Sequence, residues 1–83
     1  SRAEGQWVLG DAAAALRTLR AGVPPEIADT LPVPDALATP PGAPPLALAG
    51  GLIGHPTLNL LLGAEALRAL GRPEAEAWRA AAP

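Results

Sequence analysis

The pattern of apolar positions predicts a helix in the first quarter of the chain. Residues three and four apart lie on one side of a helix, and the apolar residues at this spacing are Ala12, Ala13, Leu16 and Leu19. Asp11 can accept hydrogen bonds from the first-turn amides, and Gly22 followed by two prolines ends the helix. We therefore expect a helix from Ala12 to Ala21. The preceding stretch 6–9 (QWVL) fits either a short strand or the lead-in to this helix.

A second apolar pattern runs through the last third of the chain. It predicts a long helix over 57–70, with Pro56 in its first turn. Leucines surround the start of this helix, namely Leu58, Leu60, Leu61 and Leu62. Pro73 can begin a short final helix whose inner face carries Trp78. Residues 46–83 are thus expected to form a Leu-rich helical hairpin.

The connection between these two regions is rich in proline. Residues 23–45 contain eight of the eleven prolines, which excludes long regular structure. A short helix can run from 25 to 31, and 34–38 can form another single turn. The stretch 39–45 (TPPGAPP) is typical of an extended, polyproline-like linker. Three apolar side chains are expected to pin this crossover onto the helices, namely Leu31, Val33 and Leu37.

These elements predict a small all-α bundle of three to four helices with a Pro-rich crossover, with room for one short strand pair. The chain reads as a single small domain or a fragment, in which 1–22 is the N-terminal segment and helix, 23–45 the crossover and 46–83 the hairpin. Composition makes its core thin. Of the 83 residues 49% are hydrophobic, but 20 are Ala, 14 are Leu, and none is Phe, Tyr or Met. Without cysteine no disulfide can brace it, so help is expected from a partner subunit, from the rest of a longer chain or from a lipid phase.

The net charge and the scarcity of reactive side chains argue against several classes of function. The net charge is −2 and the six arginines are scattered among acids, which argues against nucleic-acid binding. The chain has one His and one Ser, and no Cys, Lys or Tyr. This scarcity favours a non-catalytic chain without deciding the point, and predicts neither a metal nor a cofactor. Ala, Gly, Pro and Arg all have GC-rich codons, and their abundance suggests a GC-rich bacterial genome. No signal peptide is visible, so a cytoplasmic location is expected.

A glycine run before the second long helix leaves one alternative open. Residues 49–54 (AGGLIG) follow an apolar stretch and precede a helix, an order that resembles phosphate-binding loops. Against GxGxxG, Ala49 replaces the first glycine, and the chain has no Lys. The weak candidates for such a site are Gly50, Gly51, Gly54 and His55. On this alternative the chain is a fragment of a nucleotide- or phosphate-binding enzyme.

The same region has a membrane interpretation. Residues 46–64 carry no formal charge, which would allow a single-span membrane subunit. The glycines, His55, Pro56 and Asn59 within them argue against a membrane partner.

We therefore predict a non-catalytic protein–protein interaction domain, or an accessory subunit of a larger bacterial assembly. Its partner is another protein or a second copy of the chain. The excess of leucine beyond one helix face at 58–62 would mark an interface if it is exposed. The interface candidates are Leu58, Leu61, Leu62, Trp7 and Trp78.

Overall fold

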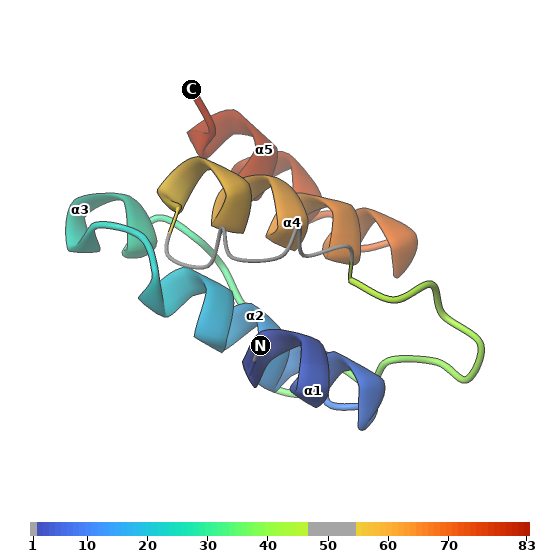
Figure 1. Ribbon diagram of the computed structural model, residues 1–83. Helices are drawn as coiled ribbons and strands as arrows, with labels where there is room; N and C mark the ends of the chain where they lie inside the picture. Colours follow the sequence, from blue (N-terminus) through green and yellow to red (C-terminus); the bar gives the residue numbers. More distant parts are fainter. Residues whose placement is uncertain (1, 47–54) are drawn as a thin grey trace.

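The computed structural model describes residues 2–46 and 55–83, which form an all-α architecture (Figure 1). The helices in these residues are α1 (Arg2–Val8), α2 (Ala12–Ala21), α3 (Pro25–Ala28), α4 (Pro56–Ala69) and α5 (Ala75–Ala81). The predicted helical class is confirmed, with more helices than predicted because 6–9, left open as strand or lead-in, mostly belongs to α1. The short strand pair is absent from the described residues, where Asp11 and Ala38 form an isolated antiparallel bridge.

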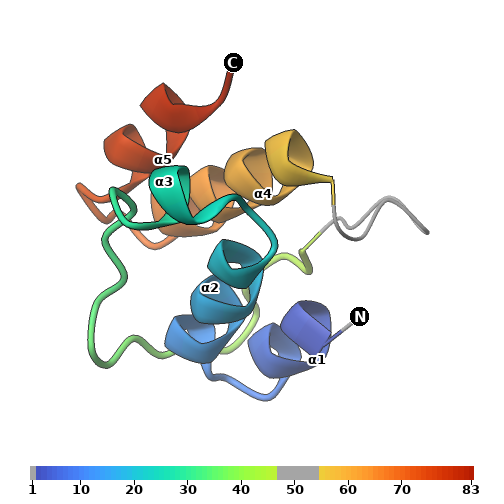
Figure 2. The same ribbon diagram turned by 90° about the vertical axis from the view of Figure 1, so that its left-hand side faces the viewer.

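The helices pack in a chain of pairs. α1 packs on α2, α2 on α4, and α4 on α5. Figures 1 and 2 show the α1–α2 pair and the α4–α5 pair as two layers, with α1 and α5 on opposite sides of the molecule. The core therefore lies between α2 and α4, and the outer helices each bury one face against it.

Helix α2 forms where the sequence predicts it. The Asp11 side chain accepts a hydrogen bond from the backbone N–H of Ala14 at 3.0 Å and so caps the first turn. Gly22 follows the last helical residue and donates its N–H to the carbonyl of Leu19 at 3.1 Å. The four residues of the predicted stripe are all buried. The capping residue, the spacing of the apolar residues and the terminating glycine therefore all predict the helix that the structure has.

Helix α4 is confirmed to within one residue at each end. It begins at Pro56, after His55 in an extended conformation. At its other end Gly71 has φ of +69°, and the N–H of Arg72 donates to the carbonyl of Leu67 at 2.9 Å. This arrangement is a Schellman motif, which favours glycine because other residues rarely adopt positive φ. Gly71 thereby turns the chain back, so that α5 lies against α4.

Two tryptophan side chains tie the crossover to the helices. The indole N–H of Trp7 donates to the carbonyl of Pro44, and that of Trp78 donates to the carbonyl of Pro32, both at 2.9 Å. Both rings are buried, with 2% of Trp7 and none of Trp78 exposed. The predicted anchoring of the crossover is also confirmed, because Leu31 is buried and two partly buried residues pack on the core, namely Val33 and Leu37.

The crossover contains less helix than predicted. The short helix ends at Ala28 rather than at residue 31, because the residue before Pro32 is disfavoured in helical conformation. Residues 34–38 form no helical turn. The chain bends at Asp35 and Ala36, and the carbonyl of Leu37 accepts from the N–H of Ala13 at 3.0 Å, which holds this segment beside α2.

The stretch 39–45 contains a tight turn rather than a continuous extended linker. The N–H of Ala43 donates to the carbonyl of Pro40 at 3.1 Å, and Gly42 has φ of +80°. With Pro41 at the second position and glycine at the third, the segment has the signature of a type II β-turn. We call residues 39–45 the proline loop.

Candidate functional site

The predicted interface residues do not form an exposed patch. Trp7 and Trp78 are core residues, so neither presents its side chain to a partner in this arrangement. Leu58, Leu61 and Leu62 are half-buried. Leu60 and Leu67 are buried and Leu62 packs against the core, whereas Leu58 and Leu61 stay partly exposed, so an interface there remains a prediction.

The phosphate-site candidates and the membrane interpretation both involve residues outside the described ranges. Gly50, Gly51 and Gly54 lie outside the described residues. His55 is exposed and precedes α4 without a side-chain capping bond. Within 2–46 and 55–83, no helix is long and apolar enough to cross a membrane. Residues 47–54 of the segment 46–64 lie outside the described residues.

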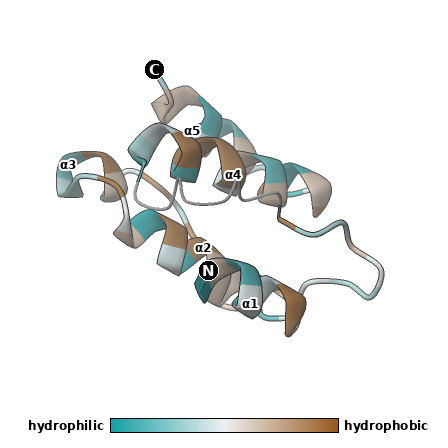
Figure 3. Cartoon of the chain, viewed as in Figure 1, coloured by the Kyte–Doolittle hydropathy of each residue, from teal (hydrophilic) through white to brown (hydrophobic). Residues whose placement is uncertain are grey.

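The exposed large apolar side chains among the described residues lie at the end of α1. Val8 is 70% exposed and Leu9 is 86% exposed. Figure 3 shows this end of α1 as strongly hydrophobic although it lies at the surface. Val8 and Leu9 are not among the interface residues predicted from the sequence, although the sequence contains a signal for their exposure. Residues 7–9 are three consecutive large apolar positions, and a helix turns about 100° per residue, so they cannot all face one core.

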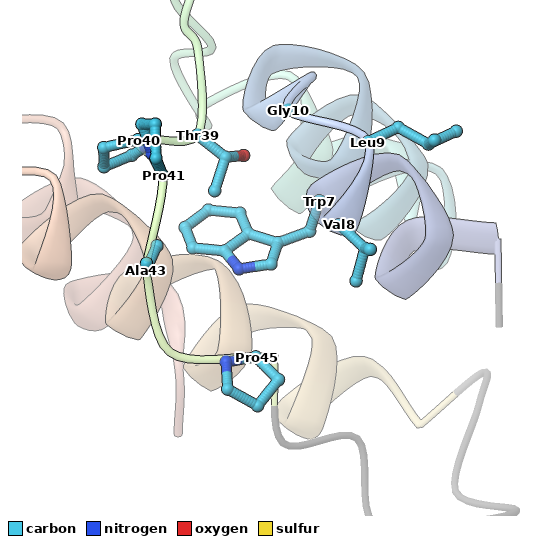
Figure 4. A pocket seen from close by; sticks show the side chains of 10 residues that line it. Trp7, Val8, Leu9, Gly10, Thr39, Pro40, Pro41, Ala43 and Pro45 are labelled. Atoms are coloured by element: carbon cyan, nitrogen blue, oxygen red, sulfur yellow. The ribbon is translucent and has the colours of Figure 1, made fainter.

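A groove adjoins these side chains (Figure 4). One wall consists of residues 7–10, and the other consists of residues 39–43 together with Pro45. Its volume is about 380 Å³. We call it the Trp7 groove, because the Trp7 ring lies between the two walls in Figure 4.

Local geometry fixes both walls of the Trp7 groove. Gly10 has φ of +92° and its N–H donates to the carbonyl of Trp7 at 3.0 Å, which reverses the chain after α1. Its carbonyl accepts from the N–H of Thr39 at 2.9 Å, so the start of the proline loop is attached to the same corner. The indole bond from Trp7 to Pro44 holds the far end of the loop. The groove is thus preformed in the free chain.

Among the described residues, no charged side chain lines the Trp7 groove. Each of four other hollows is lined by at least one charged residue. The largest of these, about 700 Å³ between α4 and α5, is lined by Arg68, Arg72, Arg79, Glu65 and Glu76. The Trp7 groove therefore suits an apolar, uncharged occupant, since burying an unpaired charge there would be costly.

Thr39 contributes a buried polar atom to the groove. Its hydroxyl oxygen Oγ1 is buried and has no hydrogen-bond partner within residues 2–46 and 55–83. Figure 4 shows the methyl group of Thr39 facing Trp7 and the hydroxyl facing the corner at Gly10. A buried hydroxyl without a partner destabilises a folded protein.

Replacing this hydroxyl is expected to stabilise the chain. Thr39→Val keeps the shape of the side chain and removes the unpaired oxygen, so the free energy of unfolding should rise by about 1 kcal/mol. Urea denaturation followed by tryptophan fluorescence measures the change. Thr39→Ser is the control, because it keeps the hydroxyl and loses the methyl group. A Thr39→Val variant no more stable than the parent would show that the hydroxyl is satisfied in solution.

The turn between α4 and α5 carries an ion pair other than the one that helical spacing in the sequence would suggest. Arg72 and Glu76, four residues apart, could pair on a helix, but Arg72 instead bonds both carboxylate oxygens of Glu74 at 3.0 and 2.8 Å. The chain turns between α4 and α5 here, so the helical spacing does not apply. The hydrogen bonds from Arg72, followed by the backbone N–H of Glu74 itself, hold the pKa of Glu74 below its ordinary value.

This ion pair predicts a pH dependence. Because the pKa of Glu74 is lower in the folded chain, the pair stabilises the fold above the ordinary glutamate pKa, and the stabilisation is lost as the pH falls through the lowered value. Glu74→Gln should lower the urea midpoint at neutral pH and flatten its decline in acid. Glu76→Gln is the matched control, since it removes the same charge and leaves the Arg72–Glu74 pair. Equal pH profiles for the two variants would contradict the assignment.

Two further observations bear on function. Among the described residues, no group of three or more His, Cys, Asp or Glu side chains is placed to hold a metal ion. Comparison with protein-family models, with curated proteins and with solved structures finds no match for this chain. The site must therefore be interpreted from its own chemistry.

Proposed function

We propose that this chain is a non-catalytic protein-interaction domain that binds an uncharged, apolar segment of another polypeptide in the Trp7 groove. The observation that supports this is the exposure of Val8 and Leu9 beside that groove. A single exposed leucine is ordinary. A contiguous apolar surface is informative, and here it continues into three exposed prolines of the loop, namely Pro40, Pro41 and Pro45.

The rigidity of the groove supports the same proposal. Proline has a fixed φ, and the loop is held by its internal turn and by the bond from Trp7 to Pro44. Little conformational entropy remains to be lost when a partner binds, which favours affinity. The role that follows is that of an accessory subunit, whose small core gains stability from a bound partner.

Selection from a phage-displayed random peptide library tests this function on the isolated chain. Enriched peptides should be apolar and without charge at the positions that enter the groove. Leu9→Asp should weaken their binding at least about tenfold, because it places a charge on the exposed apolar surface beside the groove. Ala80→Asp is the matched control, since Ala80 is exposed on α5, on the opposite side of the molecule (Figures 1 and 2).

Two outcomes would overturn the proposal. One is the absence of any enriched peptide family against the folded parent chain. The other is enrichment of peptides whose binding is weakened equally by Leu9→Asp and by Ala80→Asp, because such peptides would not occupy the groove.

A further inference from the structure

We infer that the buried amide of Asn59 sets the rotation of α4 against α2, and so fixes one arrangement of the two helical layers. Asn59 lies on α4 and is 6% exposed. Its Nδ2 atom donates to the backbone carbonyl of Leu19, on α2, at 3.1 Å. This inference concerns the orientation of the layers in Figures 1 and 2 and is independent of the proposed function of the Trp7 groove.

The apolar residues of α4 do not select one rotation of this helix by themselves. Leu60, Leu61 and Leu62 are consecutive, and at about 100° per residue they span roughly 200° of the helix circumference. The hydrophobic effect has no direction and depends on the area that is buried. Apolar burial alone would therefore allow α2 to pack against more than one side of α4.

A buried amide restricts the arrangement because its hydrogen bond has a direction. Among residues 2–46 and 55–83, Asn59 is the only buried residue with a polar or charged side chain. A rotation or a slide of α4 would carry its amide away from the carbonyl of Leu19 and leave the amide buried without that partner, which is costly. A single buried asparagine fixes the register of coiled-coil helices in this way.

The end of α2 leaves space for this amide. A Cβ atom at Gly22 would overlap Nδ2 of Asn59 and would lie 3.3 Å from its Cγ atom. The φ of Gly22 is −90°, outside the left-handed region that favours glycine. Glycine at this position is therefore required by the close approach of Asn59 and not by the backbone conformation.

Distances between two spin labels test the orientation directly. The chain contains no cysteine, so Arg17→Cys on α2 and Ala80→Cys on α5 place one label on each layer, at positions that are both exposed. Double electron–electron resonance should give one narrow distance distribution for this labelled parent chain.

Asn59→Leu is the variant that removes the amide. Leucine has nearly the same shape as asparagine, and the carbonyl of Leu19 keeps its bond from the N–H of Gly22. The variant should stay helical by circular dichroism, because an apolar group of matching shape replaces a buried polar one. Its distance distribution should broaden to at least about twice the parent width or split into two.

Thr57→Val is the matched control for Asn59→Leu. It also replaces a polar group on α4 by an apolar one of similar shape, at a half-buried position. The distance distribution should stay as narrow as in the parent. An Asn59→Leu chain that unfolds or keeps the parent distribution would overturn the inference, as would an equal broadening in both variants.

A double-mutant cycle provides a second measurement. In the parent chain the methyl group of Gly22→Ala would push the Asn59 amide off the carbonyl of Leu19. The folding equilibrium constant should then fall at least about tenfold, which corresponds to about 1.4 kcal/mol. In an Asn59→Ala background the overlapping atoms are absent, so Gly22→Ala should change the constant less than about threefold.

Urea denaturation followed by tryptophan fluorescence measures the four chains of this cycle. If Asn59→Ala does not fold, Asn59→Ser supplies the background, because its shorter side chain also ends before the amide. Equal effects of Gly22→Ala in the two backgrounds would show that the space beside Gly22 does not serve Asn59, and the inference would be wrong.

Discussion

Gly63→Ala is expected to destabilise the protein by at least about 2 kcal/mol, although alanine is the better helix former. A Cβ atom at this position would lie 2.1 Å from Cε3 and 2.2 Å from Cζ3 of the Trp78 ring. Alanine in place of glycine within a helix ordinarily gains about 0.5–1 kcal/mol. Overpacking a rigid core costs about 1–3 kcal/mol and occasionally more. Here the clash should exceed the helical gain.

The indole cannot move aside to relieve this clash. Trp78 is fully buried, and its ring nitrogen is bonded to the carbonyl of Pro32. Any shift of the ring would break that bond or separate α5 from α4. Gly63 is therefore the position where the backbone of α4 makes room for Trp78, one of the two tryptophans in the core.

Gly5→Ala is the matched control for Gly63→Ala. Gly5 lies inside α1, and a Cβ added there would meet no atom within 4 Å. The same substitution should thus stabilise the chain by about 0.5–1 kcal/mol. Urea denaturation followed by circular dichroism compares the two. A stabilising Gly63→Ala would contradict the close packing of α4 against Trp78.

The helices that could be predicted are those where several local signals agree. In α2 the capping Asp11, the 3–4 spacing and the terminating Gly22 all point to the same boundaries, and the structure has them. Helix α1 was not predicted because the stretch 6–9 is too short to distinguish a strand from a helix. Ala3 and Trp7, four residues apart and both buried, are the signal that could have identified it.

The candidate site was missed because its location depends on tertiary contacts. The leucines of α4 look excessive for one helix face, but α2 and α5 both pack against this helix. Likewise, the sequence shows neither that Trp7 is turned inward nor that its indole holds the proline loop at Pro44. Val8 and Leu9 are exposed because Trp7, at the same end of α1, faces the core.

Trp78→Ala is expected to cost about 4 kcal/mol, within the range measured for tryptophan deletions in protein cores. The ring has no exposed surface and fills the space above Gly63. Its removal leaves a cavity that α4 and α5 can close only by shifting toward each other out of their present packing. Because small domains have total stabilities of only a few kcal/mol, this variant should be largely unfolded at room temperature.

Trp7→Ala provides the comparison, because Trp7 is buried to nearly the same extent. Its ring also makes one indole hydrogen bond, to Pro44. However, Trp7 borders two hollows, of about 380 and 190 Å³, which both involve the proline loop. The loop can move into the space that the ring vacates, so the cavity that remains is smaller. Since the cost of a deletion grows with the residual cavity, Trp7→Ala should cost at least about 1 kcal/mol less than Trp78→Ala.

Circular dichroism in urea measures both alanine variants, because each removes a fluorophore. If Trp78→Ala does not fold, the phenylalanine variants keep the comparison open. Trp78→Phe and Trp7→Phe each remove an indole N–H and retain an aromatic ring. Both indole–carbonyl bonds are only part-buried, so each variant should lose about 1 kcal/mol. A Trp7 substitution that costs more than its Trp78 counterpart would show that the proline loop, rather than the α4–α5 contact, is the more tightly packed part of the chain.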